Sequence, residues 1–192
     1  MKKMILAGGC GLLAVLGLIV LGAGLYIMST YNRIVTGEQS VAGAWSQVQT
    51  NLQRRGDLIP NLVETVKGYA AHEMEVFESV AQARSRLAGS ATPQETAAAN
   101  AGMTAALGRL LAIAENYPAL KANENFTRLQ DELAGSENRV ATARKDYNDQ
   151  VRIFNTGLVR FPASLVAGFF GKTARDFFEA EAARQEVPKV QF

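Results

Sequence analysis

The sequence is poor in residues that build disulfides and metal sites, since its 192 residues include one cysteine, Cys10, and one histidine, His72. A single cysteine excludes an internal disulfide and a multi-cysteine metal site. One histidine without a second histidine or a cysteine partner excludes a zinc site of the usual type. We expect His72 to be a hydrogen-bonded residue at the edge of a helical core.

Motifs of catalysis and of nucleotide binding are also missing. The sequence has no Gly-rich phosphate loop and no Glu-x-x-His motif of the di-iron bundles, and a Ser–His–Asp triad would depend on one unsupported histidine. No basic tract with interleaved aromatic residues suggests nucleic acid. We therefore predict a protein that is not an enzyme, with no catalytic, cofactor-binding or metal-binding residues, no cofactor and no nucleic-acid partner.

Charge is missing from residues 4–28, an uninterrupted apolar run. As a helix of about 1.5 Å per residue it would be about 37 Å long, enough to cross a hydrocarbon core of about 30 Å. Cleavage as a secretory signal is disfavoured, because the run is long and its end, Leu25-Tyr26-Ile27-Met28, is bulky throughout. The single cysteine lies too early in the run to follow an apolar signal core, so a buried thiol is favoured over an acylated one. The run therefore predicts a transmembrane helix.

The charges that flank this run predict its orientation. Lys2 and Lys3 precede it, and only Arg33 follows closely. Because basic residues favour the cytoplasmic side, we expect a cytoplasmic N-terminus and an extracytoplasmic domain over residues 29–192. Without the two lysines, 18 basic residues remain of the 20, against 18 acidic ones, so the outer domain is neutral overall.

Two amphipathic segments are expected next, over about 29–55 and 58–88. In the first, the apolar stripe Val41, Trp45, Val48 and Leu52 predicts that the membrane helix continues outward. Gly56-Asp57 is predicted to break it. Asp57 is a suitable N-cap for the second helix, and Pro60 falls in its first turn, where the missing N–H costs little.

Two further helices are predicted over about 93–115 and 123–158. Thr92-Pro93-Gln94-Glu95 is a capping box with proline at the first helical position, and Tyr117-Pro118 stops the helix that it begins. Apolar residues then recur every seven positions, a period typical of coiled-coil packing. These residues are Phe126, Leu133, Val140, Tyr147 and Phe154.

The helical periods predict an all-α fold, because no alternation typical of strands competes with them. We expect an N-terminal transmembrane helix that continues into an up-and-down antiparallel bundle of long helices. The chain then divides into a cytoplasmic tip and transmembrane helix over 1–28, a helical bundle over 29–158, and a C-terminal apolar segment and tail over 159–192.

Several polar residues lie next to the heptad positions. Asparagine follows an aromatic residue in Tyr147-Asn148 and Phe154-Asn155, and Arg144 closely follows Glu137. A buried polar residue beside such a seam can set helix register and partner number. Ordinary capping and surface pairing is the alternative, and both interpretations stay open.

Residues 161–171 form a second uncharged segment, which contains Phe161, Pro162, Phe169 and Phe170. It is too short to span a bilayer, which takes about 20 residues. Because successive helices of the predicted bundle alternate in direction, we expect this segment at the membrane-proximal end. Contact with lipid, contact with a neighbouring subunit and packing on the chain's own core all stay open.

A series of short motifs runs along the chain. They are Tyr31-Asn32, Arg55-Gly56-Asp57-Leu58-Ile59-Pro60-Asn61-Leu62-Val63, Glu115-Asn116-Tyr117-Pro118-Ala119-Leu120-Lys121, Glu137-Asn138-Arg139, Ala143-Arg144, Tyr147-Asn148, Phe154-Asn155, Phe161-Pro162 and Pro188-Lys189-Val190. In this combination and order they resemble the LemA family of bacterial membrane proteins.

The resemblance implies a single-pass protein of the bacterial inner (cell) membrane, in contact with lipid, with a long-helix bundle and no assigned catalytic activity. Family members are often encoded near membrane metalloproteases, which makes such a protease a candidate partner. Structural roles are expected for the motif residues Asp57, Pro60, Asn61, Tyr117, Pro118, Glu137, Arg144, Tyr147 and Asn148.

We expect the protein to be a membrane-anchored scaffold that self-assembles through its long helices. Cys10, Gly17 and Gly24 recur at heptad spacing in the apolar run and would let another helix approach closely. An adaptor or regulatory subunit of a membrane protease or other envelope protein is the alternative, and an enzyme of unrecognised type is a third.

Overall fold

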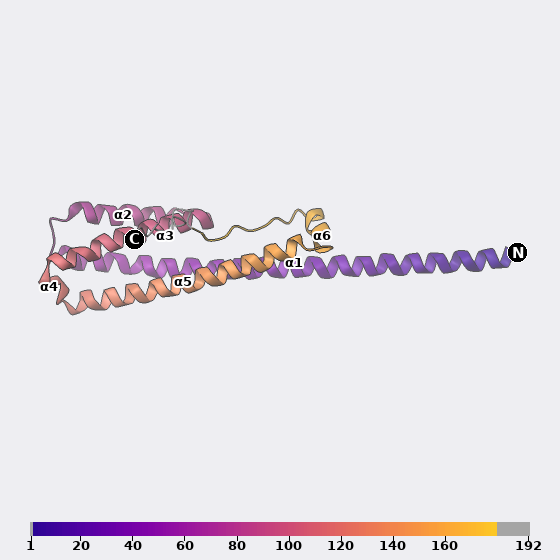
Figure 1. Ribbon diagram of the computed structural model, residues 1–192, viewed down its shortest axis with the longest axis horizontal. Helices are drawn as coiled ribbons and strands as arrows, with labels where there is room; N and C mark the ends of the chain where they lie inside the picture. The colour runs from indigo at the N-terminus through magenta and orange to yellow at the C-terminus, as the bar shows by residue number, and fades with distance from the viewer. Residues whose placement is uncertain (1, 180–192) are drawn as a thin grey trace, which may run out of the picture. The chain divides into compact units, whose positions relative to one another are not determined.

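The computed structural model describes the backbone of residues 2–179 and the side chains of residues 15–179. The side chains of Lys2, Lys3 and Cys10 and the motif at residues 188–190 lie outside these ranges. Within residues 2–179 every regular element is an α-helix and none is a strand, so the predicted all-α class is confirmed (Figure 1). The helices are α1 (Lys2–Lys67), α2 (Met74–Ala88), α3 (Pro93–Asn116), α4 (Pro118–Lys121), α5 (Glu124–Val159) and α6 (Ala163–Phe169).

Helix α1 joins the apolar run and the following amphipathic segment without interruption, as predicted. Two described helices, α1 and α3, are long and apolar enough to cross a membrane. The apolar window of α1 is only 6% buried, whereas that of α3 is 44% buried. Helix α3 is therefore a core helix of the protein, while the apolar surface of α1 is left uncovered by the described chain.

The predicted helix break at Gly56-Asp57 is wrong. Helix α1 continues through both residues and through Pro60, and the chain turns at residues 68–73 instead. Asp57 is an exposed residue inside a helix and caps nothing. The helix predicted over 58–88 is consequently two pieces, the end of α1 and the shorter α2.

Burial explains why α1 survives these two helix breakers. Glycine and proline inside a helix cost about 1 and 3 kcal/mol relative to alanine. Ile59, Leu62 and Val66 lie on one helical face beyond the expected break, and each is at most 2% exposed. Burying one such side chain contributes about 1.5–3 kcal/mol, so the three together outweigh the local penalty.

Helix α3 begins and ends as predicted. The Glu95 N–H donates to Thr92 Oγ1 over 3.2 Å, and the Thr92 N–H donates to Glu95 Oε2 over 3.2 Å, which completes the capping box. Backbone N–H donors of Ala91 and Thr92 lower the pKa of Glu95. Tyr117 follows the last residue of α3, and Pro118 opens the short helix α4.

The heptad positions of α5 all face the protein interior. The exposed fractions are Phe126 2%, Leu133 6%, Val140 1%, Tyr147 3% and Phe154 5%. The seven-residue period therefore marks an internal seam of the fold.

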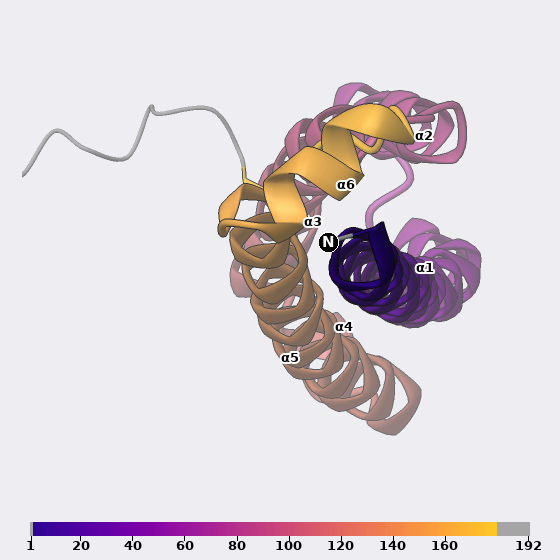
Figure 2. The same ribbon diagram turned by 90° about the vertical axis from the view of Figure 1, so that its right-hand side faces the viewer.

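The described residues form two compact units, and α1 and α5 each contribute to both. Unit 1 contains residues 2–41 and Arg152–Arg175, and unit 2 contains Ala42–Val151 and residues 176–179. Within unit 2, the end of α1, α2, α3 and α5 run in alternating directions (Figure 1). The end-on view shows α2 and α3 side by side (Figure 2). The shared core includes Ile59, Leu62, Phe77, Met103, Leu110, Leu120 and Phe126.

Candidate functional site

Clusters that could hold a metal are missing from the part of the chain described here, which contains no group of three or more His, Cys, Asp and Glu residues. His72 lies exposed in the turn at residues 68–73, so its predicted position at the edge of the core is wrong. Hydrogen bonds and ion pairs between distant parts of the sequence concentrate in two other places. One surrounds Arg55, and the other lies along residues 172–179, which we call the C-terminal segment.

Arg55 is a buried cation in unit 2, only 3% exposed. Its Nη1 donates to Asn100 Oδ1 over 2.8 Å and lies 2.7 Å from Glu137 Oε2, and its Nη2 donates to Thr104 Oγ1 over 3.2 Å. Burial lowers the pKa of Arg55, and the charge of Glu137 opposes that shift. The guanidinium therefore joins α1, α3 and α5 through a single buried cluster.

The C-terminal segment is held by two asparagines of α5 that make the same pair of hydrogen bonds. In unit 2 the Phe178 N–H donates to Asn148 Oδ1 over 2.8 Å, and Asn148 Nδ2 donates to the Phe178 carbonyl over 3.3 Å. In unit 1 the Arg175 N–H donates to Asn155 Oδ1, and Asn155 Nδ2 donates to the Arg175 carbonyl, both over 2.8 Å. Each asparagine side chain thus satisfies both the backbone N–H and the backbone carbonyl of one residue in the C-terminal segment.

Phe178 anchors the C-terminal segment in unit 2, where it is 1% exposed. Its ring centroid lies 6.0 Å from that of Trp45, and the Arg144 guanidinium lies 5.0 Å from its centroid. The Tyr147 hydroxyl donates to the Asp176 carbonyl over 2.8 Å. The aromatic–asparagine pair and Arg144 therefore serve to bind a later part of the chain.

Glu38 of α1 holds the same segment in unit 1. Its Oε2 lies 2.6 Å from Lys172 Nζ, and its Oε1 lies 2.6 Å from Arg175 Nη2. The hydrogen bond from Lys172 lowers the pKa of Glu38 most, and Arg175 lowers it further, against a rise caused by burial.

Helix α6 has one covered and one uncovered face. Ala163, Val166 and Ala167 are buried. The uncovered residues are Phe161, Leu165 and Phe169, exposed to 81%, 67% and 85%. Pro162 is the N-cap residue of α6 and makes no capping side-chain hydrogen bond, while the Phe170 ring, just after the helix, packs 4.6 Å from that of Tyr31. The apolar segment thus folds onto its own unit while large side chains stay uncovered.

The other motif residues are scattered. Asn61 is exposed on α1 and Pro60 is half-buried there, so neither forms the predicted joint with Asp57. The Tyr117 hydroxyl lies 3.5 Å from Glu73 Oε1, a contact that links the end of α3 to the turn before α2.

Sequence reasoning assigned no role to five residues that the structure makes central. Arg55 lay within a recognised motif, and Trp45 within an apolar stripe, but nothing in either pattern pointed to their partners. The others are Glu38, Asn100 and Phe178. The contacts of an isolated polar residue on a helix cannot be predicted unless its partner, distant in sequence, is known.

Known proteins share this sequence pattern. Magnetosome protein MamQ 2 of Paramagnetospirillum magneticum is 26% identical over 183 residues, covering 82% of this chain and 67% of the relative. Magnetosome protein MamQ of Magnetospirillum gryphiswaldense is 26% identical over the same length and coverage. Protein LemA of Metamycoplasma hominis is 24% identical over 140 residues, covering 71% of this chain and 63% of the relative. The LemA family model matches residues 44–192, well over half of the sequence, and the chain therefore belongs to the LemA family.

Proposed function

We propose that this protein is a membrane-anchored, non-enzymatic helical scaffold that self-assembles through its long helices. The observation that carries the proposal is the surface of α1, because every side chain from residue 15 to residue 29 is exposed. Val20 is 70% and Leu18 is 69% exposed. A contiguous apolar surface of this kind is typical of a membrane contact, and a bilayer would cover it. The relatives' names state no reaction.

The orientation proposed is a cytoplasmic N-terminus and an extracytoplasmic main domain in the bacterial inner (cell) membrane, crossed once. Lys2 and Lys3 before the run and Arg33 alone just after it support this orientation. Proteolysis of intact spheroplasts tests it: the main domain should be cut. Complete protection in sealed cells, with a protease that cuts the domain after lysis, would reverse the topology.

Self-assembly is proposed to use α1, because the heptad residues of α5 are already buried in the protein's own core. Gly17 and Gly24 lie seven residues apart on α1, and a Cβ added at either position would meet nothing within 4 Å. Small residues in this arrangement let a second membrane helix approach closely.

Native mass spectrometry of the detergent-solubilised full chain tests assembly. The wild type should form a closed homo-oligomer, and G17L/G24L should shift it toward monomer. The matched control is G22L, since Gly22 is equally open but lies on a different side of the helix. A wild type that is monomeric would refute the scaffold, and a monomer that co-purifies with a membrane metalloprotease would instead support an adaptor.

A further inference from the structure

Unit 1 contains a pocket of about 590 Å³ between the part of α1 that directly follows its exposed apolar stretch and the end of α5. Its floor is apolar and includes the buried side chains Ile34, Phe154 and Leu158. The volume lies within the range of about 300–1,000 Å³ typical of small-molecule sites.

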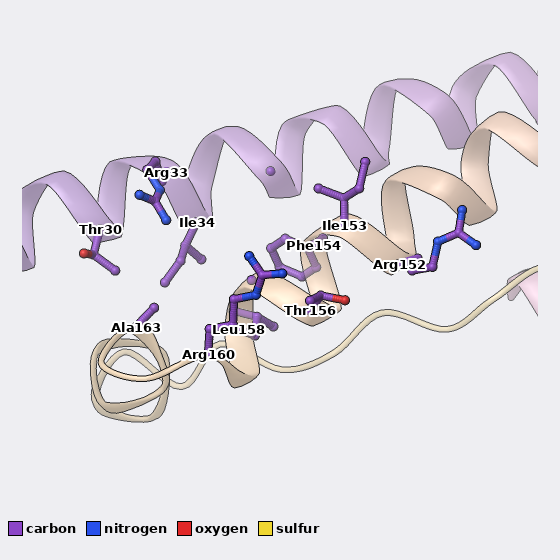
Figure 3. Close-up of a pocket in the computed structure, with 12 residues that line it drawn as sticks. Thr30, Arg33, Ile34, Arg152, Ile153, Phe154, Thr156, Leu158, Arg160 and Ala163 are labelled. Carbon is purple, nitrogen blue, oxygen red and sulfur yellow. The ribbon is translucent and has the colours of Figure 1, made fainter.

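The charged side chains at this pocket are all arginines. Arg33 lies on α1 and Arg160, just beyond α5, extends toward α1, while Arg152 lies earlier on α5 (Figure 3). Among the described residues that line the pocket, none is acidic. Glu38, a nearby carboxylate of the same unit, is already paired with Lys172 and Arg175. Arg33 and Arg160 therefore place positive charge beside an apolar floor.

The position of Arg33 along α1 identifies the environment. It follows the last residue of the uncharged run, Met28, by five positions, or about 7.5 Å of helix. The polar headgroup layer extends about 5–7.5 Å beyond the hydrocarbon core on each side. Arg33 consequently lies at the outer edge of that layer when Met28 is at the boundary of the core, and a long arginine side chain reaches back into the layer. Phe161, just before α6, and the uncovered α6 residues Leu165 and Phe169 belong to the same unit and suit the boundary between headgroups and acyl chains.

We propose that this pocket binds the headgroup of an anionic phospholipid, with its phosphate held by Arg33 and Arg160 and its glycerol and upper acyl chains against Ile34 and Leu158. Guanidinium groups bind phosphate oxygens through paired, charge-assisted hydrogen bonds. A zwitterionic lipid is disfavoured, because its ammonium group would meet arginines and no carboxylate among the residues lining the pocket. This inference rests on the proposed membrane anchoring through α1.

Native mass spectrometry of the full chain, released from nanodiscs of mixed phosphatidylglycerol and phosphatidylcholine, tests the proposal. The wild type should retain phosphatidylglycerol in preference to phosphatidylcholine. R33Q/R160Q should reduce that preference about tenfold or more, as expected for the loss of charge-assisted hydrogen bonds. The control R54Q/R109Q removes the same charge from exposed arginines of unit 2 and should leave the preference unchanged. Circular dichroism checks that both variants keep their helices.

Several outcomes would overturn the proposal. These are equal retention of the two lipids by the wild type, an unchanged preference in R33Q/R160Q, or an equal loss in both double variants. Displacement of phosphatidylglycerol by millimolar inorganic phosphate would show a simple anion site and would also overturn it. The same spectra report subunit number. A monomeric wild type with an intact lipid preference would contradict the scaffold alone. An oligomeric wild type without a lipid preference would contradict the lipid site alone.

Discussion

At the scale of single residues, Arg55 shows what a buried charge contributes to this fold. Two other helices supply its partners, Asn100 and Thr104 from α3 and Glu137 from α5. A buried ion pair adds little net stability compared with well-packed apolar residues, but removing one partner leaves a charge that nothing compensates. The cluster is therefore better suited to selecting one helix arrangement than to strengthening it.

Glu137→Ala should lower the free energy of unfolding by about 1–3 kcal/mol, because the buried guanidinium loses its carboxylate. The lower part of this range is expected, since the Glu137 side chain is 40% exposed and water reaches it. Denaturant unfolding of the full chain in detergent measures the change. The control Glu132→Ala, at an exposed position of α5, should stay within about 0.5 kcal/mol. Equal losses in the two variants would contradict a special role for Glu137.

Glu38 should make the attachment of the C-terminal segment sensitive to acid. Its pKa in the folded protein is lowered from 4.5, so the unfolded state binds more protons as the pH falls. Its contribution is therefore complete above about pH 4.5 and is lost as the pH drops through the lower folded pKa. The protection factors of the Lys172 and Arg175 amides, which correct for the intrinsic pH dependence of exchange, should fall in that window. In Glu38→Gln the exchange should be fast already at neutral pH, and a persisting acid step there would point to another group.

At the scale of elements, local signals predicted α3 and α5 well and α1 poorly. The capping box at Thr92 and the heptad of α5 are complete within one stretch of sequence, so no distant partner is needed to interpret them. The predicted break at Gly56-Asp57 failed because residue preferences of a few kcal/mol compete with the burial of side chains against other helices. That burial cannot be seen from the local sequence.

Gly56→Ala should stabilise the protein by about 0.5–1 kcal/mol, because Gly56 lies inside a helix and alanine restricts the unfolded chain. An added Cβ there would meet nothing within 4 Å. Gly37→Ala in the same helix should stabilise less than Gly56→Ala, because its Cβ would lie 3.0 Å from Phe154 Cδ2 and the ring would have to shift. Thermal unfolding of the two variants compares them. A loss of stability in Gly56→Ala would contradict a continuous helix at this position and support a break there.

The C-terminal segment illustrates a second limit of prediction. Asn148 and Asn155 drew attention because each follows an aromatic residue, but their partners are backbone groups of an extended chain 30 and 20 residues later. Any residue offers such a backbone group, so the sequence carries no mark of the pairing. Phe178 is the only side chain of the segment that is buried, and one aromatic residue forms no periodic pattern.

Asn148→Ala should loosen the C-terminal segment without melting the helices. Two hydrogen bonds to Phe178 are lost, each with a net contribution of about 0.5–1.5 kcal/mol. Amide exchange at Phe178 should accelerate by about tenfold, while the core amides of α3 exchange as before. Asn138→Ala, at an exposed position of the same helix, should leave Phe178 unchanged. Similar acceleration in both variants would argue against the asparagine pairing.

At the scale of the whole molecule, α6 and the residue Phe161 before it add a second uncovered apolar surface to that of α1. A chain with α1 alone in the bilayer would need no further uncovered apolar residues, yet Phe161, Leu165 and Phe169 are exposed. Tyr31 lies three residues beyond the uncharged run, and its ring packs on Phe170, which keeps α6 in the same unit as the end of that run. The protein thus has the means for a second contact with the lipid surface.

A tryptophan introduced as L165W should report this contact. In liposomes that contain brominated lipids, a larger fraction of the tryptophan fluorescence should be quenched in L165W than in the wild type, whose single tryptophan is Trp45. The reason is that Leu165 is 67% exposed on the uncovered face of α6. The thermal stability of F161S/F169S should remain near that of the wild type, as is usual for exposed sites. Val166→Ser, on the buried face, should lower it. Unquenched fluorescence in L165W would exclude the lipid contact.

The hydrogen bonds of Asn148 also set an order of events in the synthesis and folding of the protein. Asn148 and Phe178 are 30 residues apart. A ribosome adds about 5–20 residues per second, so the asparagine is made roughly 1.5 to 6 seconds before the backbone groups that it binds. During that interval Trp45 and Arg144 also lack the ring of Phe178, which later packs against them. Unit 2 therefore cannot complete its folding while α5 is being synthesised. Among the residues that the structure describes, its last core residue, Phe178, is made only after all six helices.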